Sequence, residues 1–144
     1  LYTFFKRTIP HPTLMTFDCP DANVACVRRT TSNTPLQALA LLNNESFLEA
    51  ARALAGRVQT ESADDEARVD FAFRRCLIRE PGADERMQLK TVLKAARDHY
   101  VAHPDDVKRL LALKAAPSAQ DTELAAWTAT MRVLLNLDEF VTRE

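Results

Sequence analysis

Glycine is scarce in this chain, because only Gly56 and Gly82 occur among its 144 residues. Two isolated glycines cannot form the Gly-rich loop that cradles phosphates, nor the G-x-G-x-x-G turn of dinucleotide-binding domains. Short strands joined by tight turns also depend on glycine, so its scarcity argues against a turn-rich β fold. The sequence is therefore expected to be helical and to lack a glycine-based nucleotide site.

The chain also lacks an excess of charge and a long apolar run. Lys and Arg total 19 against 20 Asp and Glu, which gives a formal net charge of -1. A nucleic-acid-binding domain typically carries a strongly basic face, so no nucleic-acid partner is expected. No apolar run approaches the roughly 18 residues that span a bilayer, so no membrane insertion is expected.

Cysteine-based motifs are missing as well. The three cysteines, Cys19, Cys26 and Cys76, form neither C-x-x-C nor the C-x-x-C-H of haem attachment. No cofactor is therefore expected in this chain. What is present is apolar material, since 47% of the residues are hydrophobic, enough for the core of one domain of 144 residues.

The first 33 residues differ from the rest. They contain Pro10, Pro12 and Pro20 and few helix-forming runs, and their β-prone pieces are residues 13–17 and 24–28. We expect residues 1–33 to form an irregular, extended arm with at most one small hairpin. Because the sequence begins at Leu1 without an initiator Met, we interpret it as the C-terminal part of a larger protein.

Helical signals begin at Thr34. Thr34 is a good N-cap, Pro35 suits the first helical position, and Gln37 completes a capping box. Residues 36–42 are apolar nearly all round, which predicts a buried helix. Asn43 and Asn44 interrupt this run, and the sequence leaves open whether one bent helix or two follow.

Three later segments repeat apolar residues at the spacing of an amphipathic helix. A shorter helix is expected at residues 105–113, started by Pro104, and a linker at residues 115–120. We therefore predict one all-α domain, an irregular bundle of five or six helices over residues 34–144 with the arm at its N-terminus. The three stripes comprise Val69, Ala72, Phe73, Cys76 and Leu77; Leu89, Val92, Leu93, Ala96 and Tyr100; and Leu124, Trp127, Thr128, Met131, Leu134 and Leu135.

The candidate binding residues lie just before the Thr34 helix. Arg28, Arg29 and Asn33 are polar residues close to a helix N-terminus, which attracts negative charge. They are candidates for an anion or for an acidic partner surface. The alternative is that the arginines are solvated or paired with nearby carboxylates.

Two sharper constellations are weaker on chemical grounds. His99 and His103 lie one helical turn apart, but two histidines without a third firm ligand make a poor zinc site, and a solvated helix end explains them better. His11, Asp18 and Ser32 contain the residue types of a hydrolase triad, but nothing in their spacing requires one. No metal and no catalytic residue are predicted.

Several strings of the sequence are distinctive, and the most specific is NTPLQAL at residues 33–39. Together they resemble a planctomycete-specific domain family of unknown function over nearly the whole chain. The other strings are residues 1–7, 15–18, 27–29, 42–43, 73–77 with Arg79 and Pro81, and 134–144. After Leu77 the family usually has a small residue, often Gly, where this chain has Ile78, so a glycine-type helix stop is not expected there.

The resemblance implies a context rather than a reaction. In that family the domain closes large exported proteins whose upstream parts resemble c-type cytochromes, so an exported or periplasmic location and haem elsewhere in the parent protein are implied. Cys26 and Cys76 lie in or beside such strings, and in an oxidising compartment they form either a disulfide or two free thiols. The family supplies no catalytic residues.

Two functional hypotheses follow from different classes. The first is a non-catalytic binding or scaffolding domain that docks onto the upstream domains of its own parent chain. The second is part of an enzyme that acts on extracellular polysaccharide or another exported substrate. A polar cleft lined by Asp18, Arg28, Arg29 and Asn33 favours the enzyme, whereas an exposed apolar patch on the arm favours docking.

Overall fold

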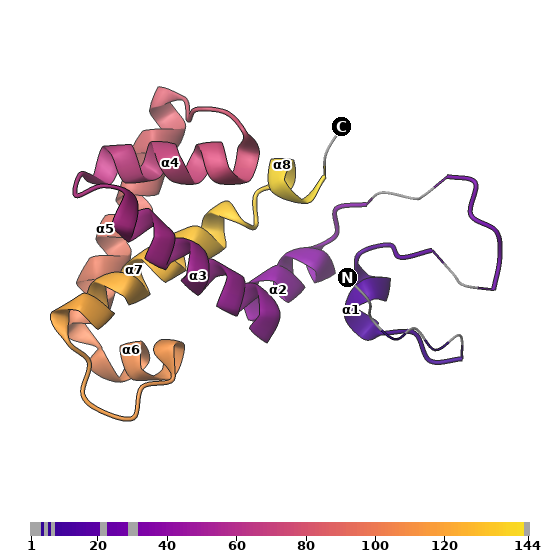
Figure 1. The fold of residues 1–144 in the computed structure, drawn as a ribbon, viewed down its shortest axis with the longest axis horizontal. Coiled ribbons are helices and arrows are strands. Elements are labelled where there is room, and N and C mark those ends of the chain that lie inside the picture. Colours follow the sequence, from indigo (N-terminus) through magenta and orange to yellow (C-terminus); the bar gives the residue numbers. More distant parts are fainter. Residues whose placement is uncertain (1–3, 5, 7, 21–22, 29–31, 143–144) are drawn as a thin grey trace.

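The computed structural model describes residues 4, 6, 8–20, 23–28 and 32–142, and in this part of the chain it contains eight α-helices and no strand (Figure 1). The all-α prediction is confirmed, and six of these helices have eight or more residues. The helices are α1 (Pro12–Thr16), α2 (Pro35–Asn43), α3 (Glu45–Glu61), α4 (Asp65–Leu77), α5 (Ala83–Ala102), α6 (Pro104–Leu111), α7 (Ala119–Leu134) and α8 (Asp138–Val141).

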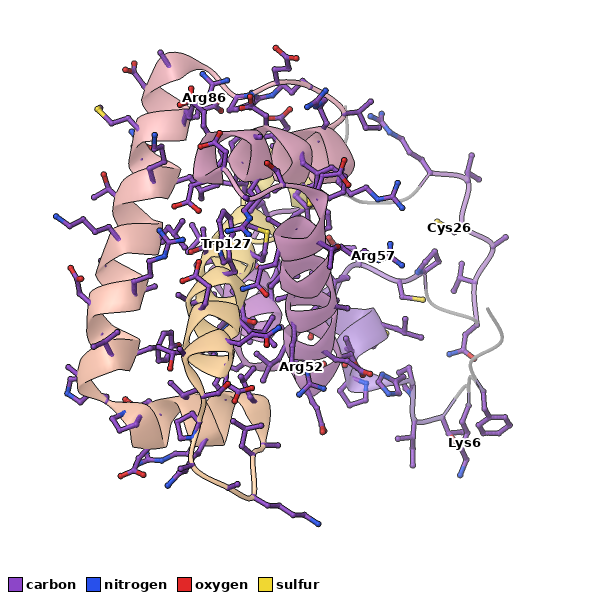
Figure 2. All side chains as sticks on the ribbon, turned by 60° about the vertical axis from the view of Figure 1, so that its left-hand side comes forward. Lys6, Cys26, Arg52, Arg57, Arg86 and Trp127 are labelled. Atoms are coloured by element: carbon purple, nitrogen blue, oxygen red, sulfur yellow. The ribbon has the colours of Figure 1, made fainter. Side chains whose placement is uncertain are left out.

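Helix α7 is the centre of the bundle. It packs against α3 and α5, and α4 and α6 complete the surroundings (Figure 1). Trp127 lies in the middle of the bundle in Figure 2, and Trp127, Met131 and Leu134 of α7 are completely buried. Helix α1 packs against α2, well away from α7 (Figure 1), and Phe17 at its end contacts Phe47 of α3 with ring centroids 5.6 Å apart.

The core confirms the predicted apolar stripes. Phe73 of α4 and Leu93 of α5 are 2% and 1% exposed, and both pack in one cluster with Trp127. On α3 two of the three fully buried residues are alanines, Ala51 and Ala55, and small side chains allow the neighbouring helix to approach closely. The spacing of apolar residues was therefore sufficient to identify the buried faces.

Asn44 separates α2 from α3, which answers the question that the sequence left open. Its extended backbone ends α2, and its side-chain oxygen accepts a hydrogen bond from the Ser46 amide at the start of α3. One residue therefore ends one helix and caps the next, because asparagine is a good N-cap and breaks helices readily. Two helices are present.

Two expectations for the first 42 residues are wrong. Residues 13–17 lie mostly in α1 rather than in a strand, because Pro12 takes the first helical position, and residues 24–28 form no strand either. Helix α2 is not buried all round, since Leu36 and Leu39 are 62% and 57% exposed. An all-apolar helix needs neighbours on every side, and the described residues cover one side of α2 only.

The expectation that α4 has no glycine-type stop after Leu77 is wrong. Ile78 adopts φ 62° and ψ 23°, the left-handed conformation, and thereby ends α4 as a glycine would. A β-branched residue is strained there because its side chain crowds the backbone. No described helix is long and apolar enough to cross a membrane.

Candidate functional site

The start of α2 is the place where the arm, α2 and the C-terminal segment meet. Thr34 caps the helix through the predicted capping box: the Gln37 amide donates to Thr34 Oγ1 at 3.2 Å, and the Thr34 amide donates to Gln37 Oε1 at 2.9 Å. This reciprocal pair satisfies two backbone donors that a helix start leaves without partners.

Gln37 connects the capping box to the arm. It is 1% exposed, and its side-chain nitrogen lies within hydrogen-bond distance of Thr16 O at 2.9 Å, Ser32 Oγ at 3.1 Å and Asp18 Oδ2 at 3.2 Å. A buried amide is stable only when its polar atoms have partners. Gln37 therefore holds the end of α1 and the segment before Thr34 against α2.

Asp18 completes this cluster. Its Oδ2 accepts hydrogen bonds from the Ser32 amide at 2.9 Å and the Ser32 hydroxyl at 2.7 Å, and its backbone has φ 55°. Aspartate tolerates this left-handed conformation better than most residues, so it allows the chain to turn directly after α1. We call Thr16, Asp18, Ser32, Thr34 and Gln37 the α2 cluster.

Of the three residues with the side chains of a hydrolase triad, the α2 cluster contains Asp18 and Ser32 but not His11. Ser32 and Asp18 hydrogen-bond each other, whereas His11 is exposed at the start of α1 and forms no hydrogen bond with either of them in the described structure. A serine nucleophile needs a base that accepts its proton, usually a histidine held by a carboxylate. The Ser32–Asp18 pair therefore orders the arm rather than activating a nucleophile.

The three predicted binding residues differ in their positions and contacts. Asn33 is exposed, and its side-chain amide donates to the Asp138 carboxylate of α8. Arg28 is exposed and forms no ion pair with another described residue, while its carbonyl accepts from the Cys26 thiol at 3.2 Å. Arg29 lies outside the described residues. The structure thus places Asn33 at a contact between the arm and α8, while Arg28 is exposed.

Arg79 fixes the C-terminal segment beside this contact. Its guanidinium donates to both oxygens of Glu139 in α8, at 2.8 and 2.6 Å, and to both oxygens of Glu85 in α5, at 2.8 and 2.6 Å. These charge-assisted bonds lower the pKa of Glu85 to about 2, lower that of Glu139, and raise the pKa of Arg79. The same guanidinium lies 5.5 Å from the Phe73 ring centroid, so it also covers the core.

Exposed apolar side chains are concentrated on the arm and α2. Seven of the eleven exposed large hydrophobic residues in the described structure lie between residues 4 and 39. We call these seven residues the apolar arm surface: Phe4, Ile9, Met15, Val24, Val27, Leu36 and Leu39. Single exposed apolar residues are normal, but such a concentration on one end of a domain is typical of an interaction surface.

His99 and His103 lie at the C-terminal end of α5 and have hydrogen-bond partners there. His99 Nε2 lies 3.0 Å from Asp106 Oδ2, and His103 Nδ1 lies 2.9 Å from the His99 carbonyl oxygen. The two rings stack with centroids 4.5 Å apart, and the described residues contain no group of three or more side chains able to hold a metal ion. These contacts account for both histidines.

The two cysteines of the predicted alternatives are free thiols in different surroundings. Cys26 is exposed on the arm, far from the bundle in Figure 2, whereas Cys76 is 7% exposed in the core. Burial raises the pKa of the Cys76 thiol to about 11. Cys26 and Cys76 are therefore two free thiols in this structure and do not form a disulfide with each other.

Three features of this site were not predicted from the sequence: the hydrogen bond from Asn33 to Asp138, the ion pair of Arg79 with Glu139, and the exposure of Leu36 and Leu39. The first two had a signal, because Asn33, Arg79 and residues 134–144 all lie in the distinctive strings. In both pairs, residues from two of these strings lie in contact in the fold although they are far apart in the sequence.

The comparisons with known proteins give one match. Residues 1–93, nearly two thirds of the chain, match the model of a family described as "PSD1: Protein of unknown function (DUF1553)". The matched region contains the arm, the α2 cluster and Arg79, whereas α7 and α8 follow it. No curated protein and no solved structure is detectably similar to the chain.

Proposed function

The chain belongs to this PSD1 family of unknown function, and from that premise we propose that it is a non-catalytic docking domain whose apolar arm surface binds the upstream part of the same parent protein. The resemblance of its distinctive strings supports a large exported protein with cytochrome-like domains as that parent. Haem would then belong to the partner domains and not to this chain.

The observation that carries the proposal is the pair Leu36 and Leu39. They are 62% and 57% exposed on a helix whose start is fixed by the capping box and by the buried Gln37. Leucines separated by one turn on an ordered helix form a ready-made apolar contact face. Burial of such side chains contributes roughly 1.5–3 kcal/mol each when they move fully out of water.

The hydrogen bonds of the described part of the arm support the same proposal. Hydrogen bonds from Gln37 and Ser32 hold the arm at Thr16 and Asp18, and Asn33 joins it to α8. A surface that is ordered before binding loses less conformational entropy when its partner arrives. Exposed Arg28 adds a positive charge beside this surface, which suits an acidic rim on the partner.

The enzyme alternative gains no support from the described geometry. Of the residues expected to line a catalytic cleft, Asp18 hydrogen-bonds Ser32 and Gln37, and Asn33 donates to Asp138 of α8. Arg28 is exposed, and Arg29 lies outside the described residues. The side chains of Asp18 and Asn33 thus serve the attachment of the arm. We therefore favour docking over a role in polysaccharide chemistry.

A binding experiment with the two parts of the parent protein tests the proposal. The 144-residue chain and the separately expressed upstream part are mixed, and their affinity is measured by calorimetry. We expect binding that weakens at least about tenfold when Leu36 and Leu39 are both changed to Ser. Changing Arg28 and Arg29 to Ala should weaken binding more at low salt than at high salt.

Val133→Ser is the matched control, since Val133 is an exposed apolar residue of α7 outside the apolar arm surface. It should leave the affinity unchanged, and all variants should keep the helical circular dichroism of the unaltered chain because the changed residues are exposed. Equal affinity of the Leu36→Ser/Leu39→Ser variant and the unaltered chain, or no binding of the unaltered chain, contradicts the proposal.

A further inference from the structure

One side of α5 carries a stripe of side chains that the bundle does not bury. Met87, Lys90, Lys94, Arg97 and Val101 follow one another at alternating intervals of three and four residues. This spacing places the five side chains on one face of the helix, with apolar residues at the two ends and cations between them. Met87 and Val101, at the two ends, are 62% and 74% exposed.

The stripe forms the wall of a groove. Toward α4, a hollow of about 820 Å³ is lined by the first four stripe residues, by Leu93, and by Asp65 and Glu66 from the first turn of α4. Toward α7, a second hollow of about 330 Å³ is lined by Arg97 and Val101 together with Ala119, Thr122 and Glu123. Arg97 lines both hollows, so they adjoin at this residue along α5, which lies at the edge of the molecule (Figure 2).

The floor of this groove is a connected set of polar contacts. The Arg97 guanidinium donates to Asp65 at 2.5 and 3.0 Å and to Glu123 Oε2 at 2.9 Å. Glu123 in turn accepts from the Trp127 indole at 3.0 Å, and the Arg68 guanidinium lies 5.7 Å from the centroid of that indole. A groove built on such a connected set of partners keeps its shape before a ligand binds.

Among the cationic residues that line the groove, one has no ion-pair partner in the described part of the chain. Lys90 lies 3.6 Å from Glu66, Arg86 pairs with Asp70 at 2.8 Å, and Arg97 pairs with Asp65 and Glu123. Lys94, between Lys90 and Arg97 on the stripe, is exposed and forms no ion pair with any described residue. A ligand that fits must therefore bring a carboxylate to the middle of the groove and apolar groups to its ends.

We infer that the groove along α5 binds an acidic amphipathic helix of a partner protein, with apolar side chains against Met87 and Val101 and a carboxylate against Lys94. From Met87 to Val101 the stripe is about 21 Å long at 1.5 Å per residue, so the partner helix needs at least about four turns. Methionine suits such a contact because its flexible thioether adapts to different apolar surfaces.

The same charges argue against a second copy of this chain as the occupant. An antiparallel pair of α5 helices centred on Lys94 would bring the cations of one stripe against those of the other. Like charges in close contact across an interface cost several kcal/mol. A partner with the opposite charge at these positions has no such cost.

A designed peptide tests the inference. The probe is a capped helical peptide of about 16 residues with Leu at both ends of one face and Glu at the positions between. A matched peptide has Lys in place of each Glu. Fluorescence anisotropy with the 144-residue chain should show binding of the Glu peptide and at least about tenfold weaker binding of the Lys peptide.

Charge reversal locates the site. Lys94→Glu should weaken the Glu peptide about tenfold and strengthen the Lys peptide, whereas Lys114→Glu, at an exposed lysine of the α6–α7 connection, should change neither. The inference is overturned if the unaltered chain binds neither peptide, if it binds both equally, or if the Lys94 and Lys114 variants behave alike. The Leu36→Ser/Leu39→Ser variant should bind the Glu peptide normally, so this test is independent of the docking proposal.

Discussion

Arg79 and Glu139 lie sixty residues apart in the chain, yet the guanidinium of one donates two hydrogen bonds, at 2.8 and 2.6 Å, to the carboxylate of the other. Through this pair Arg79, the second residue after the end of α4, holds the start of α8. Phe140 and Leu137 of the same segment pack on the main core. The C-terminal segment is thus held both by an ion pair and by apolar contacts.

The Arg79 ion pairs predict that stability falls in acid. The pKa of Glu85 is lowered to about 2 from 4.5 and that of Glu139 is lowered too, both chiefly through hydrogen bonds from Arg79. A carboxyl whose pKa is lower in the folded state stabilises the fold above its unfolded pKa, and this contribution is lost as the pH falls toward the folded value. We therefore expect the urea midpoint to fall between about pH 4.5 and about pH 2.

Arg79→Gln should remove part of this pH dependence, because Gln cannot form the charged pairs. Arg75→Gln is the control, since Arg75 is exposed and forms no ion pair with a described residue. The effect is modest, because the side chains of Arg79 and Glu85 are more than a third exposed and solvent screens them. Identical acid profiles for the two variants would show that the Arg79 pairs do not contribute.

The features that sequence predicted correctly are those that depend on neighbours within one helix. The stripe through Phe73 follows from 3.6-residue periodicity, and the capping box of Thr34 and Gln37 follows from residue types three positions apart. Both are local, so no knowledge of the remaining chain is needed. The buried helix faces and the start of α2 could therefore be predicted.

The features that sequence did not predict depend on residues far apart in the chain. Asn33 and Asp138 are separated by 105 positions, and no local pattern pairs them. The exposure of Leu36 and Leu39 depends on which elements cover α2, and an apolar run alone does not reveal a missing neighbour. The capping box at the start of α2 could be predicted from the sequence, but the contacts around it and the apolar arm surface could not.

Ile78 provides a test of backbone strain. It is 76% exposed with φ 62°, so its side chain contributes little burial while its backbone occupies the left-handed region. Glycine adopts this conformation without steric cost, and a side chain there costs roughly 1–2 kcal/mol. We expect Ile78→Gly to stabilise the domain by about 1 kcal/mol in urea denaturation, after the entropy that glycine adds to the unfolded chain is subtracted.

Ala95→Gly gives the matched comparison, because Ala95 is exposed within the regular helix α5. There glycine should destabilise by about 1 kcal/mol, as it does inside helices generally. Opposite signs at the two positions support strain at Ile78. A loss of stability in both variants would mean that the left-handed conformation of Ile78 carries no strain.

The different surroundings of Cys76 and Cys26 predict very different thiol reactivity. The thiolate is the reactive form, and burial both covers the Cys76 sulfur and raises its pKa to about 11. Cys26 is exposed on the arm. A disulfide reagent such as DTNB at about pH 8 reacts readily with an exposed thiol. Cys26→Ser should therefore remove a fast labelling phase, whereas Cys76→Ser should leave that phase intact.

Cys76 should be labelled only as the domain unfolds, so its labelling should accelerate in urea in step with the loss of helical circular dichroism. Rapid labelling of Cys76 in the Cys19→Ser/Cys26→Ser variant without urea would show that α4 opens readily, and would remove Cys76 from the stable core.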